Sequence, residues 1–258
     1  MTRSRLAYYA ASIGTLWRGV RNWPLLPLLA MRVPLTLTLA DGLRLRVRTL
    51  LDMWVVKETC LDDGYACLGR VAPDGVVVDV GAGLGDFALW AARQLRPRAV
   101  FAFEPHPGSF ALLTHNLALN DARLVQAHAV ALGAATGLKV LRRGAEPTQS
   151  RVVASGAGDT GDTEVWSLAD AFDRCGIDVC DLLKVDIEGG EFALLLDAPP
   201  AVLRRIRHLR VEYHDDVEAR DHRVLVRALE AAGFVVGRVP SPVHPRLGIL
   251  VADRPASG

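Results

Sequence analysis

Long apolar runs are absent from this 258-residue sequence, which contains no stretch of about 20 uninterrupted apolar residues, the length of a membrane-spanning helix. The N-terminus also lacks a continuous apolar segment followed by a small-residue cleavage site, which a secretory signal peptide would show. The four cysteines form two loose pairs without the C-x-x-C spacing of structural zinc and thioredoxin sites. We therefore expect a cytoplasmic protein with reduced thiols.

Net charge is also scarce, because 30 lysine and arginine residues nearly balance 29 aspartate and glutamate residues and leave +1. Proteins dedicated to binding nucleic acid normally carry a clear basic excess, so no nucleic-acid partner is expected. Half of the residues are hydrophobic, and the length suits one large α/β domain with a small addition. We divide the chain into an N-terminal helical and β-hairpin extension, residues 1–72, and a main domain, residues 73–258.

The first 40 residues contain no acidic residue, and aromatic and leucine side chains alternate there with Arg3, Arg5, Arg18, Arg21 and Arg32. One interpretation is an interfacial helix on an anionic membrane, which would make the protein membrane-peripheral. The other is a helix that packs on the main domain or on a second copy in a homodimer, with its arginines solvated. An apolar stripe has that second role more often. The sequence leaves both open.

Alternating leucines follow from Pro34, and Asp41-Gly42 interrupts them. Alternating apolar residues on both sides of an Asp-Gly pair predict a β-hairpin with a tight turn. Residues 52–67 are predicted to be an irregular or helical lead-in to the main domain.

From residue 73 onwards strands alternate with helices, which predicts a mostly parallel sheet with helices on both faces. A polar stretch, residues 133–162, is predicted to be a mobile or hairpin-like insertion because it contains Gly156, Gly158 and Gly161. The expected fold is α/β, a doubly wound, Rossmann-like sheet of seven strands. Strands are expected at residues 75–80, 98–103, 123–127, 181–187, 206–213, 234–239 and 247–251, with helices at 86–95, 107–120, 167–175, from 191, and at 217–232.

A glycine-rich turn follows the first of these strands and reads Asp79-Val80-Gly81-Ala82-Gly83-Leu84-Gly85-Asp86. Ligands of doubly wound sheets bind at the carboxyl ends of strands, where glycines allow close approach of the backbone. A dinucleotide-binding turn would have another glycine in place of Asp86. Carboxylates here would repel a pyrophosphate and attract a cation. The turn thus favours the sulfonium cofactor S-adenosylmethionine over a nicotinamide, held by Asp79, Gly81, Ala82, Gly83 and Gly85.

Glu104 ends the second strand, about 20 residues after the glycine turn. An acidic side chain at this place accepts hydrogen bonds from the ribose hydroxyls of a nucleoside-containing cofactor. Together with the adjoining Pro105, Glu104 is predicted to complete the cofactor site.

A third candidate segment, Lys184-Val185-Asp186-Ile187-Glu188-Gly189-Gly190-Glu191, ends the fourth strand. Asp186 could hold the cofactor's amino group, orient a substrate hydroxyl or bind a divalent cation. Alternatively, Glu188 and Glu191 favour the N-terminus of the next helix, and Lys184 pairs with one of them. We take Asp186 as a candidate catalytic residue and leave a metal ion open.

The fifth strand ends in Glu212-Tyr213-His214-Asp215-Asp216. A histidine has an ordinary pKa of about 6.5, which suits a general base, so His214 is the second candidate catalytic residue. The alternative is an ordinary surface histidine.

Several segments together resemble the FkbM family of methyltransferases. The resemblance covers roughly residues 58–250, and its departure is Gly83, where the family more often has asparagine. The segments are Val78 to Gly85, Phe103-Glu104-Pro105-His106-Pro107, Asn116 with Asn120, Ser167-Leu168-Ala169-Asp170, Leu183 to Glu191, and Val211-Glu212-Tyr213-His214.

This resemblance implies a class I methyltransferase fold, S-adenosylmethionine as donor, and O-methylation of a sugar, glycolipid or natural product. It implies cofactor roles for Asp79, Gly81, Gly83 and Glu104, and site roles for Asp186 and Glu188.

The expected reaction is an in-line transfer, in which His214 or an Asp186-bound metal ion removes the acceptor proton. Two rivals are a nicotinamide-dependent oxidoreductase on a similar fold and a non-catalytic, membrane-associated binding protein.

Overall fold

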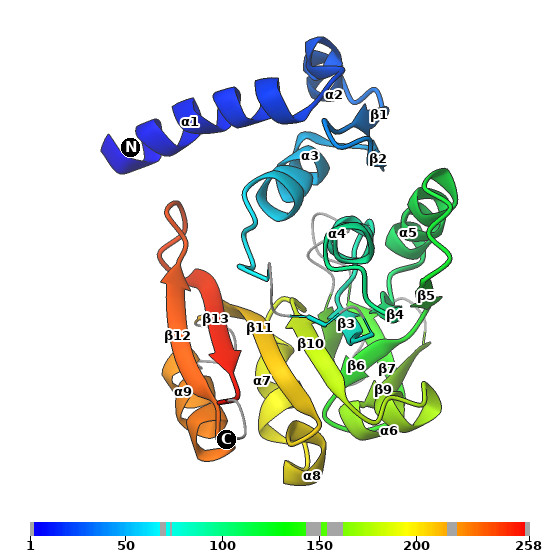
Figure 1. Ribbon diagram of the computed structural model, residues 1–258, viewed down its shortest axis with the longest axis vertical. Coiled ribbons are helices and arrows are strands. Elements are labelled where there is room, and N and C mark those ends of the chain that lie inside the picture. Colours follow the sequence, from blue (N-terminus) through cyan, green and yellow to red (C-terminus); the bar gives the residue numbers. More distant parts are fainter. Residues whose placement is uncertain are drawn as a thin grey trace.

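The computed structural model describes residues 3–67, 71–72, 74–142, 151–153, 162–215 and 221–255, and a seven-stranded sheet lies at its centre (Figure 1). The strands lie side by side in the order β12 (Val235–Pro240), β13 (Leu247–Asp253), β11 (Ile206–His214), β10 (Cys180–Val185), β3 (Val76–Val80), β4 (Ala99–Phe103) and β5 (Val125–His128). All neighbours from β11 to β5 pair in parallel, whereas β13 is antiparallel to both β11 and β12. This arrangement confirms the predicted seven-stranded, doubly wound fold with its closing hairpin.

Helices cover both faces of the sheet, because successive residues of a strand point to opposite sides. On β3, Val76 and Val78 join one apolar core, and Val77 joins another. The helices α6 (Leu168–Arg174), α7 (Glu191–Leu196), α8 (Pro200–Leu203) and α9 (His222–Ala231) contribute to the first core, and α4 (Asp86–Gln94) and α5 (Pro107–Leu119) to the second. Ligands of doubly wound sheets bind at the carboxyl ends of the parallel strands, so the residues at these ends are where a site is expected.

Side-chain caps fix where two of these helices begin. The Ser167 hydroxyl accepts a hydrogen bond from the N–H of Asp170 and starts α6, close to the predicted position. The Asp221 carboxylate caps α9 in the same way through the N–H of Arg223. The predicted helix over residues 217–232 therefore begins at His222 in the described part of the chain, and residues 216–220 lie outside it.

The N-terminal extension contains the predicted helix and β-hairpin. The Asp41 carboxylate accepts the N–H of Leu43, and Gly42 has a φ of 91°, which together form the expected turn. The elements are α1 (Arg3–Gly19), η1 (Trp23–Leu25), α2 (Pro27–Ala30), β1 (Leu35–Thr38), β2 (Arg44–Val47), α3 (Leu50–Val56) and the π-helical turn η2 (Lys57–Leu61). No helix in the described part of the chain has the length and apolar character needed to cross a bilayer. The four cysteines are free thiols.

The extension shares an apolar core with the main domain. Leu37 and Leu45 of the hairpin are buried in the same cluster as Leu84, Leu89 and Leu112. Because these leucines come from the glycine turn, α4 and α5, the hairpin lies against that turn and those two helices.

Two asparagines, one on α5 and one that caps its C-terminal end, join the hairpin to the main domain by forming hydrogen bonds like those of a neighbouring strand. The Asn116 side chain accepts the N–H of Arg46 at 2.7 Å and donates to the carbonyl of Arg46 at 3.2 Å. Asn120, four residues later, makes the same pair of hydrogen bonds with Arg44. Asn116 also donates to the carbonyl of Leu84 at 2.9 Å, so one buried amide connects the hairpin with the glycine turn.

The predicted insertion contains strands of a second sheet. Its described strands lie in the order β6 (Ala131–Gly133), β9 (Asp162–Ser167), β7 (Gly137–Arg142) and β8 (Arg151–Val153). The β7–β8 pair is antiparallel, as a hairpin requires. The three glycines that indicated mobility, Gly156, Gly158 and Gly161, lie outside the described residues.

Candidate active site

The turn after β3 approaches the end of β10 more closely than a side chain would allow. Gly81 has a φ of 77°, and a Cβ atom there would lie 1.8 Å from the carbonyl oxygen of Asp186. Gly83 has a φ of 53°, and among the described residues no atom beyond its chain neighbours lies within 4 Å of its Cβ position. Position 81 therefore requires glycine, whereas the open space at position 83 leaves room for a ligand.

Glu104 lies beside this turn, at the end of β4. Its Oε2 accepts the N–H of Gly83 and its Oε1 accepts the N–H of His106, each at 2.8 Å. The side chain is 7% exposed, and burial raises its pKa to about 7. A carboxylate oxygen has two lone pairs, so Glu104 can still accept a ligand hydroxyl while both backbone donors hold it. The half-buried Pro105 follows at the same strand end.

Asp79 is fully buried and has a cationic neighbour in the adjacent strand. Lys184 is its register partner on β10, with Nζ 3.0 Å from Oδ1 of Asp79 and 2.8 Å from the carbonyl oxygen of Gly81. Burial raises the pKa of Asp79, and the Lys184 ammonium opposes that rise. The prediction that Lys184 pairs with Glu188 or Glu191 is wrong, because the parallel register places Asp79 beside it and Asp186 at 3.9 Å.

Asp186 and Glu212 lie on neighbouring strand ends, and a tyrosine bridges them. The Tyr65 hydroxyl is 3.4 Å from Oδ2 of Asp186 and 3.3 Å from Oε2 of Glu212. Burial and the negative charge of Asp186 raise the pKa of Glu212. One hydroxyl proton can serve only one carboxylate at a time, so a proton retained by Glu212 would satisfy the second contact.

Tyr65 comes from the lead-in segment after η2 and has no signal in the sequence pattern. Its backbone carbonyl accepts a hydrogen bond from Nε of Arg210 at 3.0 Å. Arg210 lies on β11, is fully buried, and is balanced by Asp253 at 2.8 Å. A buried, paired guanidinium thus holds the lead-in segment at the edge of the sheet where Asp186 and Glu212 end their strands.

His214 lies between two carboxylates of the segment that follows β10. Its Nδ1 is 3.1 Å from Oε1 of Glu191, and its Nε2 is 3.5 Å from Oε2 of Glu188. Burial disfavours the charged ring, but the hydrogen bond to Glu191 and the nearby carboxylates outweigh it and raise the pKa of His214 to about 9. Glu191 is itself fully buried and also accepts the N–H of Gly189 at 2.7 Å. The structure therefore describes a buried histidine that holds its proton at neutral pH.

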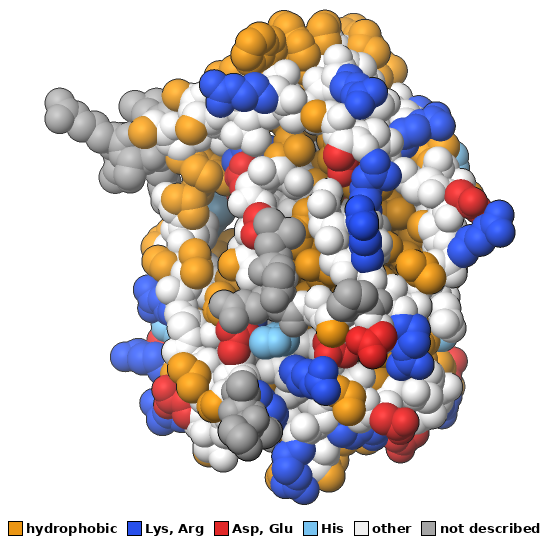
Figure 2. Space-filling model, viewed as in Figure 1, with side chains coloured by type: hydrophobic (Ala, Val, Ile, Leu, Met, Phe, Trp, Pro, Cys, Tyr) orange, Lys and Arg blue, Asp and Glu red, His pale blue; other side chains and the backbone are white. Residues whose placement is uncertain are grey.

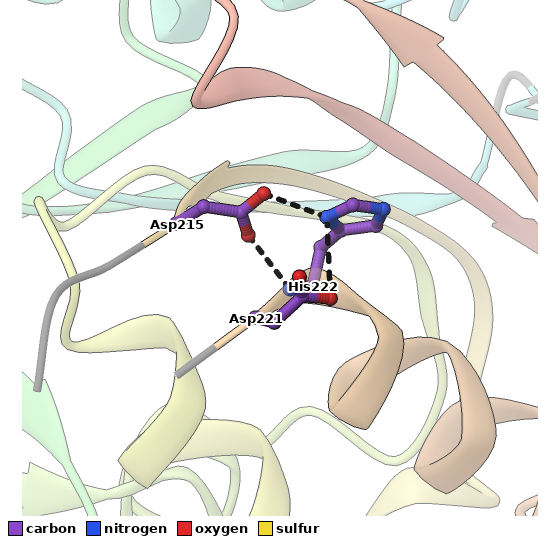
Figure 3. Close-up of side chains that lie close together, drawn as sticks. All are labelled: Asp215, Asp221 and His222. Atoms are coloured by element: carbon purple, nitrogen blue, oxygen red, sulfur yellow. Dashed lines mark hydrogen bonds and ion pairs between the residues drawn. The ribbon is translucent and has the colours of Figure 1, made fainter. Parts of the chain in front are cut away.

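Asp215 and Asp221 converge on His222, as Figure 3 shows. Oδ2 of Asp215 is 2.8 Å from Nδ1 of His222, and an Arg238 nitrogen is 2.8 Å from Nε2. Because arginine can only donate, Nε2 accepts and Nδ1 donates to Asp215. Within the described residues this is the group of three whose ligand atoms lie close enough for one metal ion, and Asp186 is not part of it. Both ring nitrogens are already engaged, so the cluster acts as a hydrogen-bonded link between β11 and α9.

The described geometry fits the predicted cofactor. The turn at Gly83 is open, and the Glu104 carboxylate accepts a hydrogen bond from that turn. Asp79 and Asp86, at the two ends of the glycine turn, are buried acidic residues, and Lys184 balances the charge of Asp79. A ligand with hydroxyls at one end and positive charge at the other matches this arrangement. Asp86 is also buried, and burial raises its pKa to about 6.

Comparison with known proteins gives the same assignment. Residues 79–236 match the methyltransferase FkbM domain, a range that includes the glycine turn, Glu104, Asp186 and His214. Methyltransferase sdnD of Sordaria araneosa is 27% identical over 220 residues, which cover 72% of this chain and 83% of that protein. The 31-O-demethyl-FK506 methyltransferase FkbM of Streptomyces tacrolimicus is 30% identical over 237 residues, covering 80% of this chain and 90% of that protein.

A solved structure shares the fold. Methyltransferase FkbM from Methylobacillus flagellatus KT aligns with a TM-score of 0.51 and 19% sequence identity. The alignment covers 90% of this chain and 59% of that one.

Proposed function

The chain belongs to the FkbM methyltransferase family, and we propose that it transfers the methyl group of S-adenosylmethionine to a hydroxyl oxygen of a sugar, glycolipid or natural product. The name of the Streptomyces relative specifies methylation at an oxygen, which supports the choice of atom. The observation that carries the proposal is the carboxylate pair Asp186 and Glu212, bridged by Tyr65 where β10 and β11 end.

The donor side of the proposed site is formed by β3, β4 and the turn between β3 and α4. Glu104 would accept hydrogen bonds from the ribose hydroxyls, because its two carboxylate oxygens are already fixed by backbone N–H groups. Gly83 leaves space for the nucleoside, and the acidic Asp86 favours a cationic ligand, whereas the charge of Asp79 is already balanced by Lys184. S-adenosylmethionine supplies an electrophilic methyl group when it is bound.

The acceptor side needs a group that removes a hydroxyl proton. His214, the base expected from the sequence, already carries a proton at neutral pH and then has no free lone pair. Burial and the charge of Asp186 raise the pKa of Glu212 to about 8, so its carboxylate accepts a proton in the ionised form, which predominates above that pH. Ionised Glu212 is then a stronger base than an ordinary glutamate, and Tyr65 connects it to Asp186. We therefore assign proton acceptance to Glu212 and orientation of the hydroxyl to Asp186. His214 would position the end of β11 through its contact with Glu191.

Donor binding is tested first, by calorimetric titration with S-adenosylhomocysteine and separately with NAD. We expect binding of the homocysteine compound alone, and Glu104→Gln should weaken it by about 10- to 100-fold, the loss of a charge-assisted hydrogen bond. Tight binding of NAD without S-adenosylhomocysteine would replace the methyltransferase proposal by an oxidoreductase.

Acceptor chemistry is tested with isotope-labelled S-adenosylmethionine and a panel of hydroxylated sugars, glycolipids and polyketides. Glu212→Gln should lower kcat by about 10²- to 10⁴-fold with unchanged affinity for S-adenosylhomocysteine. Glu230→Gln, at an exposed position on α9, is the matched control. Full turnover by Glu212→Gln would refute its role, and transfer to nitrogen or carbon acceptors alone would refute O-methylation. Loss of turnover in EDTA that Mg²⁺ restores would instead assign the proton step to a metal ion at Asp186.

A further inference from the structure

The N-terminal extension exposes several large apolar side chains close to one another. On α1, Ile13 is 70% exposed and Trp17 is 59% exposed, and the four-residue spacing places both on one helix face. Trp23 in η1 and Leu50 at the start of α3 are also largely exposed, at 44% and 47%. Figure 2 shows hydrophobic side chains covering the top of the molecule, where Figure 1 places α2 and the adjoining end of α1.

These side chains line a groove between α1, the η1–α2 segment and α3. Its volume is about 450 Å³, and every residue that lines it is apolar. We call this feature the cap groove, and its lining includes Ile13, Leu16, Trp17, Trp23, Leu50 and Met53. A soluble monomer rarely exposes a contiguous apolar surface of this kind unless that surface binds something.

The N-terminal extension that forms the cap groove carries an excess of positive charge. Residues 1–72 contain ten lysines and arginines against five acidic residues, whereas residues 73–258 contain 20 against 24. The near-neutral net charge of the whole chain is therefore the sum of a basic N-terminal extension and an acidic main domain. Arg18, Arg21 and Arg32 are exposed on the elements that form the groove or adjoin it, and Figure 2 shows Lys and Arg side chains just below the hydrophobic top.

We propose that the cap groove and these arginines dock the protein onto an anionic bilayer surface. Tryptophan, isoleucine and leucine side chains enter the boundary between headgroups and acyl chains, and arginines at the rim contact lipid phosphates. A second copy fits less well, because a two-fold interface at this face would bring the same arginines of both copies together. Charge complementarity thus selects the bilayer, independently of the methyl acceptor.

Co-sedimentation of the full chain with vesicles tests this proposal. Phosphatidylcholine vesicles that contain phosphatidylglycerol should bind the protein, and vesicles of phosphatidylcholine alone should bind it weakly. The double variant Ile13→Ser/Trp17→Ser should lower the partition coefficient by about tenfold or more, because it removes apolar groups from the lipid boundary. Arg18→Gln/Arg32→Gln should lower it by about tenfold in low salt and less in high salt.

Matched controls separate docking from a general change in the surface. Val235→Ser removes a side chain that is 67% exposed on β12, and Arg98→Gln removes an exposed arginine just before β4. Neither residue belongs to the N-terminal extension, so both variants should bind like the wild type. Binding of S-adenosylhomocysteine should be unchanged in every variant, which shows that the fold is intact. Tryptophan emission should shift to the blue with anionic vesicles, and Trp17→Phe should reduce that shift.

Three results would overturn the proposal. The first is a wild type that binds vesicles of neither composition. The second is vesicle binding by Ile13→Ser/Trp17→Ser and by Arg18→Gln/Arg32→Gln that equals the binding of Val235→Ser. The third is a wild type that binds no vesicles but forms a dimer in sedimentation velocity, with Ile13→Ser/Trp17→Ser dissociating that dimer. A second copy of the chain would then occupy the cap groove.

Discussion

The strand-end site and the cap groove differ in which groups each hides from water. At the strand ends Asp79, Lys184 and Glu191 are charged side chains with almost no exposed surface. At the cap, Ile13 and Trp17 are apolar side chains with most of their surface exposed. Burying a charge is unfavourable unless it is paired, and exposing an apolar patch forgoes the stabilisation of burial. Both regions are thus less stable than they could be, and each is a region proposed to bind a partner.

Substitution of a buried charge at the strand ends should lower the free energy of unfolding more than any other change considered for the two regions. Lys184→Met removes the cation 3.0 Å from Asp79 while keeping side-chain length, and it leaves a carboxylate unpaired inside the protein. The free energy of unfolding, measured by urea denaturation, should fall by about 3–5 kcal/mol. Asp79→Asn in the same chain should recover part of that loss, because the orphaned charge is gone. Arg123→Gln breaks an exposed pair with Asp121 and should leave the unfolding midpoint unchanged.

Protonation of His214, in the same region, makes the free energy of unfolding depend on pH. Its pKa is about 9 in the folded protein and about 6.5 in the unfolded chain, so the folded state holds the proton more tightly. This contribution is complete below about pH 6.5 and disappears as the pH rises through about 9, with an upper limit of about 3 kcal/mol. The stability difference between wild type and His214→Gln should therefore shrink across this interval. His115→Gln, at an exposed site on α5, should keep the wild-type pH profile, and a parallel profile for His214→Gln would contradict the assignment.

The junction between the two regions should be the next most sensitive. Asn116→Ala leaves the backbone groups of Arg46 and the carbonyl of Leu84 without their partner, and should cost about 2 kcal/mol of unfolding free energy. Asn120→Ala removes the analogous but more exposed bonds to Arg44 and should cost about 1 kcal/mol or less. Equal losses from both substitutions would show that burial does not distinguish the two asparagines.

The cap should respond least to substitution. Ile13→Ser/Trp17→Ser should change the free energy of unfolding by no more than about 0.5 kcal/mol, because neither side chain belongs to the core. Thermal and urea unfolding without vesicles measure this. A loss of several kcal/mol would mean that the groove is part of the folding core, and the contrast with the strand ends would fail.

Much of the fold was predictable because its signals are local. The β-branched run before Gly81 predicts a fully buried strand, and Asp41-Gly42 predicts a turn, since each pattern depends on neighbouring residues. Glu104 could be placed in the same way, from its position at the end of a strand. Sequence reasoning also located the loop-bearing ends of β10 and β11, because parallel strands end at one edge.

Contacts across the sheet were not predictable with the same reliability. Lys184 was matched with glutamates a few residues away, although the register of β10 on β3 pairs it with Asp79. Tyr65 reaches Asp186 and Glu212 across 121 and 147 positions of sequence, through a segment held by Arg210. The protonated state of His214 depends on two carboxylates from another strand end. Each of these features is a product of tertiary packing, which periodicity and spacing do not encode.

The approach of Gly81 to Asp186 limits how this sequence can change over time. Any side chain at position 81 would place its Cβ 1.8 Å from the carbonyl oxygen of Asp186. The end of β10 would then have to move away from β3, so the pairing of these two strands requires glycine at this position. Position 83 has a φ of 53° and free space around it, and asparagine tolerates that backbone conformation better than most residues. Space and backbone conformation thus permit asparagine at position 83, whereas position 81 has no room for a side chain. Gly81 and Gly83, two positions apart in the same turn, therefore differ in which substitutions the structure permits.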